Sequence, residues 1–539
     1  MLSIKKTISA LLACTCLTLT GFTACNGGSN ADSSLSNSSL SSNDSASLPD
    51  DTSSGSSTDE SSPDENSSSE TSSPTDDSSW EDKEPTWEED DLPLSDGLRY
   101  TLSEDETSYA VSGIGTCKDK IIVIPERYND LPVTAIADNA FWDKFEIVGV
   151  QIPDTVTYIG KEAFWNCTSL EKVIIPDSVI TIADRAFQCC IRLQGVKIGK
   201  EVNEIGALAF NNCPALSYIR VSGDNPYFES LEGNLYDQAQ TTLIQYAIGK
   251  KTAYFTLPDT VISITDYAFH TAAYLQSVDF GNHLSVIGAH AFDGCAALTE
   301  QLRFPDSLTE IQDEAFANCQ ALGGALTLPN GLQKIGVSAF SECTNLTGKL
   351  TLPQSLRTLG AAAFYKCRKL MGLEIQANLT EIPEFAFYMC YNLKGELKIP
   401  DSVEKIAASA FGWCYELTAL TLGEKVKTIG ESAFYYCRKL QGELTIPDSV
   451  TKIETSAFAF CEKLTALKIG AGVKELHTSA FADCDSLASV YFPDVEGWIC
   501  SKHDDLSGAI SISSTDLQDA RKAALYLTQN YATYYWKNK

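Results

Sequence analysis

Apolar residues recur along most of this chain in units of 23 or 24 residues, and each unit contains two short apolar stretches separated by a turn. The alternation at 173–175 predicts a short strand with inward side chains, and Pro-Asp-Ser at 176–178 predicts a turn. We expect a second extended stretch at 179–182, and then a short helical turn in which Phe187 fills the centre. The apolar positions of this representative unit are Leu170, Val173, Ile175, Val179, Ile182, Ala186, Phe187 and Cys190.

Fourteen Ala-Phe pairs mark the repeat, and twelve of the thirteen intervals between them are 23 or 24 residues. A fixed period in this range is typical of a solenoid, in which each unit buries its apolar face only against its neighbours. The pattern therefore predicts a repeat array instead of one globular core. The pairs begin at Ala140, Ala163, Ala186, Ala209, Ala268, Ala291, Ala315, Ala339, Ala363, Ala386, Ala410, Ala433, Ala457 and Ala480.

Two kinds of departure from the period are informative. Five units are one residue longer, as at 346–353 and 440–447, and the extra residue before the strand predicts a bulge or a loop adjustment that preserves the inward phase. The one long interval, from Ala209 to Ala268, is 59 residues. It contains an insertion at about 223–252, which we expect to form a hairpin that projects from the array.

The repeats occupy residues 140–493 and need a cover at each end, because terminal repeats expose an apolar face. Residues 97–139 alternate apolar and polar positions, which predicts strands that form an N-terminal cap. Residues 494–539 are expected to form the C-terminal cap, with an amphipathic helix at 516–530 and an aromatic end at 534–536.

At 175–190 the unit has the form Ile-Pro-Asp-Ser-Val-x-x-Ile-x-x-x-Ala-Phe-x-x-Cys, which resembles the BspA-like leucine-rich repeats of bacterial surface proteins. The resemblance covers about residues 97–493. It implies a right-handed leucine-rich-repeat solenoid of the α/β type, with one parallel sheet and short helical turns. It also implies a place on the cell surface and, for some members, adhesion to host proteins or to other microbes.

The first 24 residues are typical of a signal peptide, since two lysines precede an uncharged stretch of apolar or small residues at 7–23. The end of this stretch resembles a bacterial lipobox and implies lipidation of Cys25, although Phe22 stands where Leu is usual. A plain secretory signal is the alternative. Cys14 also follows a lipobox-like Leu-Leu-Ala, but cleavage there would leave apolar sequence behind it. We expect contact with the membrane through a lipid anchor only.

The segment between the signal peptide and the repeats is strongly acidic. Residues 26–96 contain nineteen Asp or Glu and one Lys, a net charge of −18 out of −31 for the whole chain. Such a segment cannot bury enough apolar area to offset its conformational entropy, so residues 25–96 are expected to be a disordered, extended linker. The acidic balance also argues against nucleic acid as a partner.

Eighteen cysteines raise the question of disulfides or metal sites. One Cys at one phase in each turn predicts a stacked column of buried thiols, since free Cys is small and readily buried. Disulfides or metal binding are the alternative, although no close Cys-Cys or Cys-His pair of the zinc type accompanies the column. The twelve column residues, three positions after the repeat Phe, are Cys167, Cys190, Cys213, Cys295, Cys319, Cys343, Cys367, Cys390, Cys414, Cys437, Cys461 and Cys484.

The sequence predicts no catalytic residue, no cofactor and no metal ligand. It contains no nucleophile elbow, phosphate loop or metal-binding helix motif. The many carboxylates are expected to be solvated surface charge. The five histidines fall on unrelated phases of the repeat: His270, His283, His290, His477 and His503.

Two surface features are candidates for ligand binding. The first is the position between the two inward residues of each first strand, which should line an exposed sheet face and holds five basic and two acidic residues over the array. Ordinary polarity of a β-face is one interpretation, and a mildly basic stripe that receives an acidic or polar ligand is the other. The basic residues are Lys197, Arg220, Arg303, Lys398 and Lys468.

The second candidate is a set of aromatic residues that follow the repeat Phe in the C-terminal half. Packing between turns is the simpler expectation for them. Rings that project outward would instead form a ladder on which a partner protein or a glycan stacks. The set includes Tyr365, Tyr388, Trp413, Tyr435 and Tyr436.

These features favour an extracellular, lipid-anchored bacterial surface protein that binds a host or microbial surface protein or a glycan and performs no chemistry. Two alternatives stay open. One is a structural protein that uses its length as a spacer or organiser of the cell envelope. The other is a polysaccharide-capture or hydrolytic component, for which the insertion near Tyr227 to Tyr236 would have to build a pocket.

Overall fold

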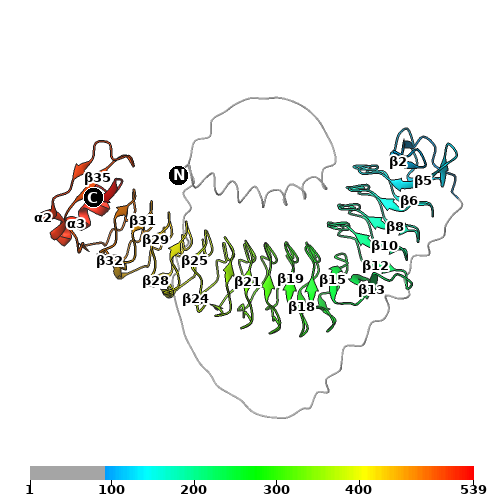
Figure 1. Ribbon diagram of the computed structural model, residues 1–539. Coiled ribbons are helices and arrows are strands. Elements are labelled where there is room, and N and C mark those ends of the chain that lie inside the picture. The colour runs from blue at the N-terminus through cyan, green and yellow to red at the C-terminus, as the bar shows by residue number, and fades with distance from the viewer. Residues whose placement is uncertain (1–91) are drawn as a thin grey trace, which may run out of the picture. The chain divides into compact units, whose positions relative to one another are not determined.

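The computed structural model describes residues 92–539, so the predicted signal peptide, Cys25 and nearly all of the acidic linker lie outside the described residues. Leu94–Lys539 form one compact unit, in which successive turns of the chain stack side by side in sequence order (Figure 1). The predicted repeat solenoid is confirmed.

Most turns contribute one strand to each of two parallel ladders. In the unit at 170–190 the first strand is β8 (Lys172–Ile175), which pairs with β10 (Gly195–Ile198) of the next turn. The second is β9 (Thr181–Ile182), which pairs with β11 (Glu204–Ile205). The resemblance implied one parallel sheet. A second ladder forms because both apolar stretches of the unit are extended and both find a partner one turn away.

The two ladders run along the described solenoid in chain order, with interruptions in pairing. The other strands of the first ladder are β3 (Ile121–Val123), β6 (Gly149–Gln151), β12 (Tyr218–Val221), β16 (Tyr254–Thr256), β18 (Ser277–Asp279), β22 (Lys349–Leu352), β24 (Gly372–Ile375), β26 (Gly395–Lys398), β28 (Leu417–Thr421), β30 (Gly442–Thr445), β32 (Leu464–Lys468) and β34 (Ser489–Tyr491). Those of the second are β5 (Leu131–Ile136), β7 (Tyr158–Ile159), β15 (Thr242–Gln245), β17 (Ser263–Ile264), β19 (Val286–Ile287), β20 (Glu310–Ile311), β21 (Lys334–Ile335), β23 (Thr358–Leu359), β25 (Glu381–Ile382), β27 (Lys405–Ile406), β29 (Thr428–Ile429), β31 (Lys452–Ile453) and β33 (Glu475–Leu476).

The stretch around each Ala-Phe pair is a tight corner, where a short helical turn was expected. In the turn that contains Phe164, Glu162 and Asn166 both have positive φ, 56° and 59°. The backbone N–H groups of these three residues donate to carbonyl oxygens 22 residues further on, in the next turn, at 3.0, 2.8 and 2.8 Å. Two left-handed residues interrupt a right-handed helical path. The corner is therefore stabilised by hydrogen bonds between turns as well as by bonds within one turn, such as those from Trp165 N–H to the Glu162 carbonyl and from Cys167 N–H to the Phe164 carbonyl.

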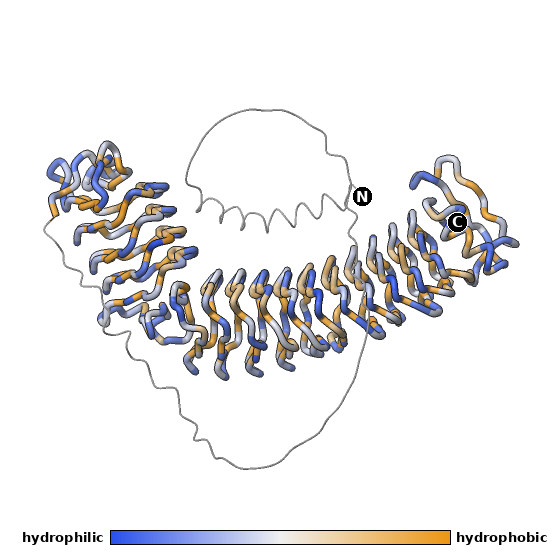
Figure 2. The backbone as a smooth tube through the Cα atoms, turned by 180° about the vertical axis from the view of Figure 1, so that it is seen from behind, coloured by the Kyte–Doolittle hydropathy of each residue, from blue (hydrophilic) through white to orange (hydrophobic). Residues whose placement is uncertain are grey.

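The repeat Phe and Ala side chains fill the interior. The repeat Phe rings are at most 2% exposed, and neighbouring rings stack with centroids 4.4 to 5.7 Å apart. Figure 2 shows hydrophobic and hydrophilic positions within each turn, as the sequence pattern requires. Burial of one Phe contributes about 1.5–3 kcal/mol, and because each ring lies between turns, that stabilisation belongs to neighbouring pairs of turns.

The predicted column of thiols is confirmed. All fifteen cysteines among residues 92–539 are buried and free. Each of the twelve column thiols donates its S–H to the carbonyl oxygen of the repeat Phe one turn earlier, at Sγ–O distances of 3.1 to 3.5 Å. The Cys thus packs as a small apolar side chain and also satisfies a buried carbonyl group.

The long interval conceals one further, degenerate turn. Tyr246 stacks on Phe269 with ring centroids 4.7 Å apart, and its N–H donates to the Ala268 carbonyl at 3.0 Å, as a repeat Phe does. Gln245-Tyr246 therefore stands in the place of an Ala-Phe pair, 23 residues before the next one. The polar Gln and the Tyr hide this turn from a search for Ala-Phe.

The remainder of the insertion is a hairpin of β13 (Phe228–Leu231) and β14 (Asn234–Asp237). Strand β14 pairs with β15, which joins the second ladder through β17. The expectation that the hairpin projects from the array is wrong, since Asn234, Leu235 and Tyr236 are at most 1% exposed. Leu235 belongs to one hydrophobic cluster and Tyr236 to the next, so the insertion joins two sections of the core.

The extra residue of the longer units coincides with a register shift in two strand pairs of the first ladder, whereas β22, from another longer unit, pairs with β24 without a shift. The register shifts at Gly395 and at Gly442, each just before the inward Leu of the strand. Four of the five longer units carry a glycine with positive φ here: Gly324, Gly348, Gly395 and Gly442, with φ of 78°, 74°, 88° and 80°. Glycine adopts this conformation without a Cβ penalty.

Both ends of the solenoid are covered by irregular structure. At the N-terminal end, β1 (Arg99–Leu102) and β2 (Tyr109–Gly113) are antiparallel, β4 (Arg127–Tyr128) pairs with β5, and β2 leads into the second ladder. At the C-terminal end, Trp498 and Trp536 are 2% and 1% exposed and pack on the last turn. The elements there are β35 (Trp498–Ser501), β36 (Ile510–Ser511), α2 (Ser514–Gln518), α3 (Ala520–Leu525), the π-helical turn η2 (Tyr526–Asn530) and β37 (Tyr535–Asn538).

The single helix expected at 516–530 is broken at Asp519, whose extended backbone separates α2 from α3 and whose side chain caps α3. Within residues 92–539, no helix has the length and apolar character needed to cross a bilayer.

Candidate functional site

Three aromatic residues of the C-terminal half occupy the same left-handed corner position in successive turns. Trp413, Tyr436 and Phe460 have φ of 63°, 61° and 61°. Their rings stack, with centroids 4.7 Å apart for Trp413 and Tyr436 and 4.3 Å apart for Tyr436 and Phe460. All three side chains are half-buried, so each ring packs on the next turn and keeps part of its surface exposed.

A second row of rings lies beside the first. Tyr391 and Tyr415 stack at 5.1 Å, and Tyr415 is 5.6 Å from Trp413. Tyr435 lies 5.5 Å from Phe460, edge to face. We call these connected rings, from four consecutive turns, the aromatic cluster: Tyr391, Trp413, Tyr415, Tyr435, Tyr436 and Phe460.

Two arginines lie over rings of the aromatic cluster. The Arg438 guanidinium is 4.7 Å from the Tyr436 centroid and 5.6 Å from that of Tyr415. Arg368 lies 5.7 Å from the Tyr391 centroid. Arg438 is exposed and also pairs with Glu462 at 3.1 Å. Each cation–π contact of this kind contributes about 0.5–1 kcal/mol at an exposed site. The two guanidinium groups also present planar hydrogen-bond donors next to an aromatic surface.

Tyr365 and Tyr388 stack on each other at 5.7 Å and are half-buried. Lys366 lies 5.0 Å from the Tyr365 centroid and pairs with Glu342. Burial and then the neighbouring tyrosines raise the pKa of Tyr388 to about 12. Both rings pack between turns and neither projects into solvent. Packing between turns was the simpler of the two expectations for these aromatic residues.

The predicted basic stripe lies on the outer face of the first ladder, and carboxylates offset much of its charge. Lys398 pairs with Glu396 at 3.3 Å and Lys468 pairs with Glu443 at 2.6 Å. Lys197 and Arg303 are exposed, and Arg220 is half-buried. The predicted stripe comprises only one of the outward positions of each strand. The second outward position, which holds both glutamates, supplies the opposite charge.

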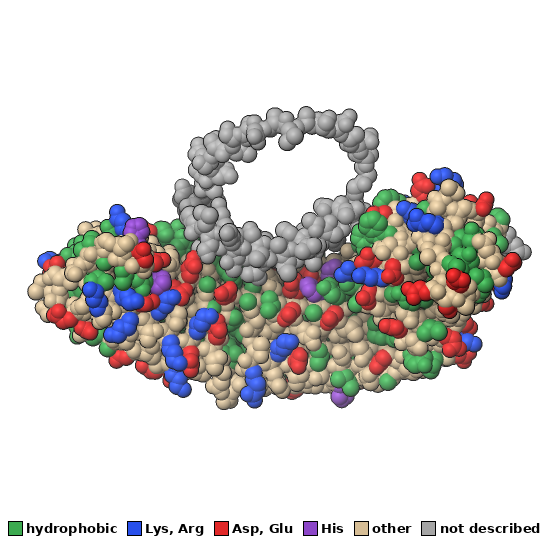
Figure 3. All heavy atoms as spheres, turned by 45° about the horizontal axis from the view of Figure 1, so that its top comes forward, with side chains coloured by type: hydrophobic (Ala, Val, Ile, Leu, Met, Phe, Trp, Pro, Cys, Tyr) green, Lys and Arg blue, Asp and Glu red, His purple; other side chains and the backbone are tan. Residues whose placement is uncertain are grey.

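Figure 3 shows one face of the molecule, on which Lys and Arg side chains are interspersed with Asp and Glu. Interspersed charges of this kind do not create a long-range field that would draw in an acidic ligand. The aromatic cluster is therefore the stronger of the two candidate surfaces.

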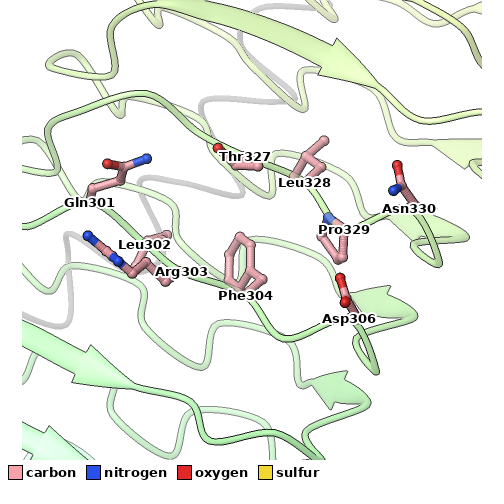
Figure 4. A pocket seen from close by; sticks show the side chains of 9 residues that line it. All are labelled: Gln301, Leu302, Arg303, Phe304, Asp306, Thr327, Leu328, Pro329 and Asn330. Carbon is pink, nitrogen blue, oxygen red and sulfur yellow. The ribbon is translucent and has the colours of Figure 1, made fainter.

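A groove opens where the first ladder is weakest. Between β18 and β22 the ladder is reduced to isolated bridges, one of them between Arg303 and Thr327. The groove there has a volume of about 480 Å³ and is lined by residues of 301–306 and 327–330 from two neighbouring turns (Figure 4). Its lining includes both Arg303 and Asp306, so it carries no single sign of charge.

The structure also brings together polar residues that the sequence did not connect. His270 and Asp293 stand two positions after the Ala of their pairs, and His290 and Glu314 stand one position before it. When successive turns stack, the position two residues after one repeat Ala lies beside the position one residue before the Ala of the neighbouring turn. His270, His290 and Glu314 therefore all surround Asp293. The available signal was the 23-residue spacing of His270 and Asp293 and the 24-residue spacing of His290 and Glu314.

The stacked turns, the two parallel ladders and the recurrent apolar positions define a leucine-rich-repeat solenoid. The family model described as the BspA type leucine rich repeat region matches residues 134–252, 245–325, 323–441 and 395–499, more than half of the chain. This chain belongs to the BspA-type leucine-rich-repeat family.

Several solved structures are similar to this chain. A leucine-rich repeat protein from Bacteroides ovatus is 25% identical over 74% of this chain and 94% of its own, with a TM-score of 0.48. A leucine rich cell surface protein from Faecalibacterium prausnitzii is 23% identical over 78% and 99%, with a TM-score of 0.36. The pneumococcal vaccine antigen PcpA is 18% identical over 67% and 93%, with a TM-score of 0.37. No curated protein matches the sequence.

Proposed function

We propose that this chain is a non-enzymatic binding protein on the outside of a bacterial cell, and that the aromatic cluster binds its ligand, a surface protein or a glycan. The observation that carries the proposal is the group of six half-buried rings in four consecutive turns, with the Arg438 guanidinium over two of them. Tyr, Trp and Arg are the residues most enriched where protein interfaces concentrate their binding energy.

The shape of the cluster also suits an extended ligand. Stacked rings repeat at each turn, the Tyr and Trp rings carry a polar atom at one edge, and the Arg438 guanidinium lies beside Tyr436. Flat apolar surface with polar groups at its rim accepts a sugar ring or an aromatic side chain of a partner. The export signal expected from the sequence supports action outside the cytoplasm.

The test is a binding screen followed by substitution. The purified chain is applied to arrays of glycans and of host and microbial surface proteins, and the dissociation constant of the ligand found is measured. Tyr436→Ala and Arg438→Ala are each expected to weaken binding by about ten-fold or more, because truncation of a central interface residue commonly costs about 2 kcal/mol. Tyr274→Ala is the matched control, since Tyr274 is 46% exposed and lies outside the cluster.

Thermal unfolding of each variant establishes that the stack is intact, and Arg438→Ala is informative in any case because its side chain is exposed. Undiminished binding by a folded Trp413→Ala/Tyr436→Ala double variant would remove the aromatic cluster as the binding surface. A folded wild-type chain that binds nothing on the arrays would favour the envelope spacer instead.

A further inference from the structure

Three side chains from two adjacent corners meet at the surface just after the insertion. His290 Nδ1 lies 3.2 Å from Asp293 Oδ2 and 3.6 Å from Glu314 Oε2. These three ligand atoms all lie within 4.8 Å of one another. His290 and Asp293 flank the repeat pair Ala291-Phe292, and Glu314 precedes the pair of the next turn. The backbone bonds between corners therefore fix the distance between the two turns that supply the side chains.

Asp293 is held in an orientation that presents one oxygen to this group. Its side chain is 4% exposed, and its Oδ1 accepts a hydrogen bond of 2.9 Å from Asn318 Nδ2 in the next turn. Oδ2 is left facing His290 and His270, at 3.2 and 3.9 Å. A carboxylate this deeply buried needs a positive partner as well as hydrogen bonds.

His290 is equally well oriented. Its ring stacks on Tyr267 of the preceding turn, with centroids 4.6 Å apart and planes 8° from parallel. The side chains of His290 and Glu314 are 17% and 15% exposed, so the group is reached from solvent although Asp293 is not.

A polar column extends from this group into the neighbouring turns. His270 Nδ1 lies 3.3 Å from Asn211 Nδ2, although the two residues are 59 positions apart in the chain. Asn211 accepts in turn from Gln188 at 3.4 Å, and Gln188 accepts from Trp165 Nε1 at 3.2 Å. His270 thus lies behind Asp293 as an oriented neighbour, with Nε2 3.9 Å from Oδ2, which is an ion-pair distance and too long for a hydrogen bond.

We propose that His290, Asp293 and Glu314 bind one divalent transition-metal ion of the Zn²⁺ class, with His270 as the oriented neighbour of Asp293. In a tetrahedral Zn²⁺ centre with bonds of about 2.0–2.2 Å, ligand atoms lie about 3.3–3.6 Å apart. The observed 3.2 and 3.6 Å from His290 Nδ1 lie close to that spacing. One neutral imidazole and two carboxylates carry a charge of −2, which a divalent ion balances. An imidazole ligand favours Zn²⁺ over Ca²⁺.

The metal ion would join two turns close to the point where the core passes from one hydrophobic cluster to the next. The second cluster begins at Tyr236, and Phe269, Phe292 and Phe316 of the turns around the site belong to it. Because repeat stability is the sum of contacts between neighbouring turns, a ligand shared by two turns stabilises this section.

The competing explanation is a protonated His290 that neutralises the two carboxylates with no metal present. Titration calorimetry of the purified full-length chain, freed of metal by a chelator, decides between them. Zn²⁺ is expected to bind with one ion per chain and to raise the unfolding temperature. His290→Gln and Glu314→Gln are each expected to weaken this binding by about ten-fold or more. His283→Gln is the control, since His283 is exposed and bonds the Asp259 carbonyl elsewhere, and it should bind Zn²⁺ as the wild type does.

Co²⁺ gives a second measurement that does not depend on stability, because its visible absorption reports the geometry and ligands of the bound ion. The absorption band should appear with the wild type and with His283→Gln, and be lost with His290→Gln. Absence of saturable Zn²⁺ binding to the wild type overturns the proposal. So does binding that is unchanged in both ligand variants, and so does equal affinity for Ca²⁺.

Discussion

Single residues stabilise this solenoid through contacts that reach the neighbouring turn. The column thiol is the clearest case, since it fills a small apolar space and donates to the Phe carbonyl of the preceding turn. Burial raises the pKa of Cys167, Cys295 and Cys437 from 9.0 to about 12 in each case. These thiols are therefore neutral in the folded chain well beyond the pH at which an unfolded thiol ionises.

Alkaline unfolding should reveal the column. Between pH 9 and about 12 the unfolded thiols have lost protons that the folded ones retain, so the free energy of unfolding falls by about 1.4 kcal/mol per pH unit for each thiol. We expect a Cys167→Ala/Cys295→Ala/Cys437→Ala variant to be less stable at neutral pH because of its cavities, but to lose stability less steeply above pH 9. Urea unfolding at a series of pH values measures both slopes, and parallel slopes would contradict this account.

The sequence predicts some features of the cysteine column and not others. The phase of the cysteines predicted burial, because one small apolar residue per turn has nowhere else to lie. It did not predict the bond to Phe, which depends on the direction of a carbonyl group set by two left-handed residues in the corner. The residue type at these left-handed positions varies from turn to turn; the second position, for example, holds Asn166 in one turn and Trp413 in another. No residue type in the sequence therefore marks them.

At the scale of elements, the longer units illustrate what a one-residue change in period does. The extra residue predicted a bulge, and the ladder shifts register at Gly395 and Gly442. The degenerate turn at Gln245-Tyr246 was not predicted, because neither residue matches the repeat pair and only the ring contact with Phe269 reveals it. The hairpin was predicted, but its burial was not, since burial depends on a neighbouring turn that the sequence pattern hid.

Gly395 offers a clean test of the bulge. A Cβ at this position would contact nothing within 4 Å, but φ is +88°, so Gly395→Ala adds backbone strain without a clash. We expect a loss of about 1–2 kcal/mol in the free energy of unfolding. Gly223→Ala is the matched control, because its Cβ would also contact nothing and its φ is ordinary. It should be neutral or slightly stabilising in the same urea experiment, and equal losses in both variants would refute the bulge as the cause.

At the scale of the whole molecule, the chain combines a repeat solenoid with an N-terminal region whose composition is acidic and poor in apolar residues. The solenoid was predictable because every turn repeats the same short-range pattern. The polar group around Asp293 was not, because it joins two phases of the repeat that become neighbours only after the turns have stacked. The same holds for the glutamates beside the strand lysines, which only the register of the ladder brings into contact.

The expected lipid anchor depends on Cys25, which lies outside the described residues. Labelling of bacteria that express the chain with radioactive palmitate should mark the wild type and leave Cys25→Ser unmarked, because acylation needs that thiol. Cys14→Ser is the matched control, since Cys14 also follows a lipobox-like sequence, and it should be labelled as strongly as the wild type. Label retained by Cys25→Ser would indicate an anchor at a different residue, and an unlabelled wild type would favour the plain secretory signal.

The thiol column has a consequence for how such a chain matures. An exported protein rich in cysteine ordinarily requires an oxidant and an isomerase before its native pairs are complete. In residues 92–539 all fifteen cysteines are free and buried, and the twelve column thiols donate to backbone oxygens, so the fold of this part of the chain contains no disulfide that an oxidant would have to form. A reducing environment therefore removes no covalent bond from it.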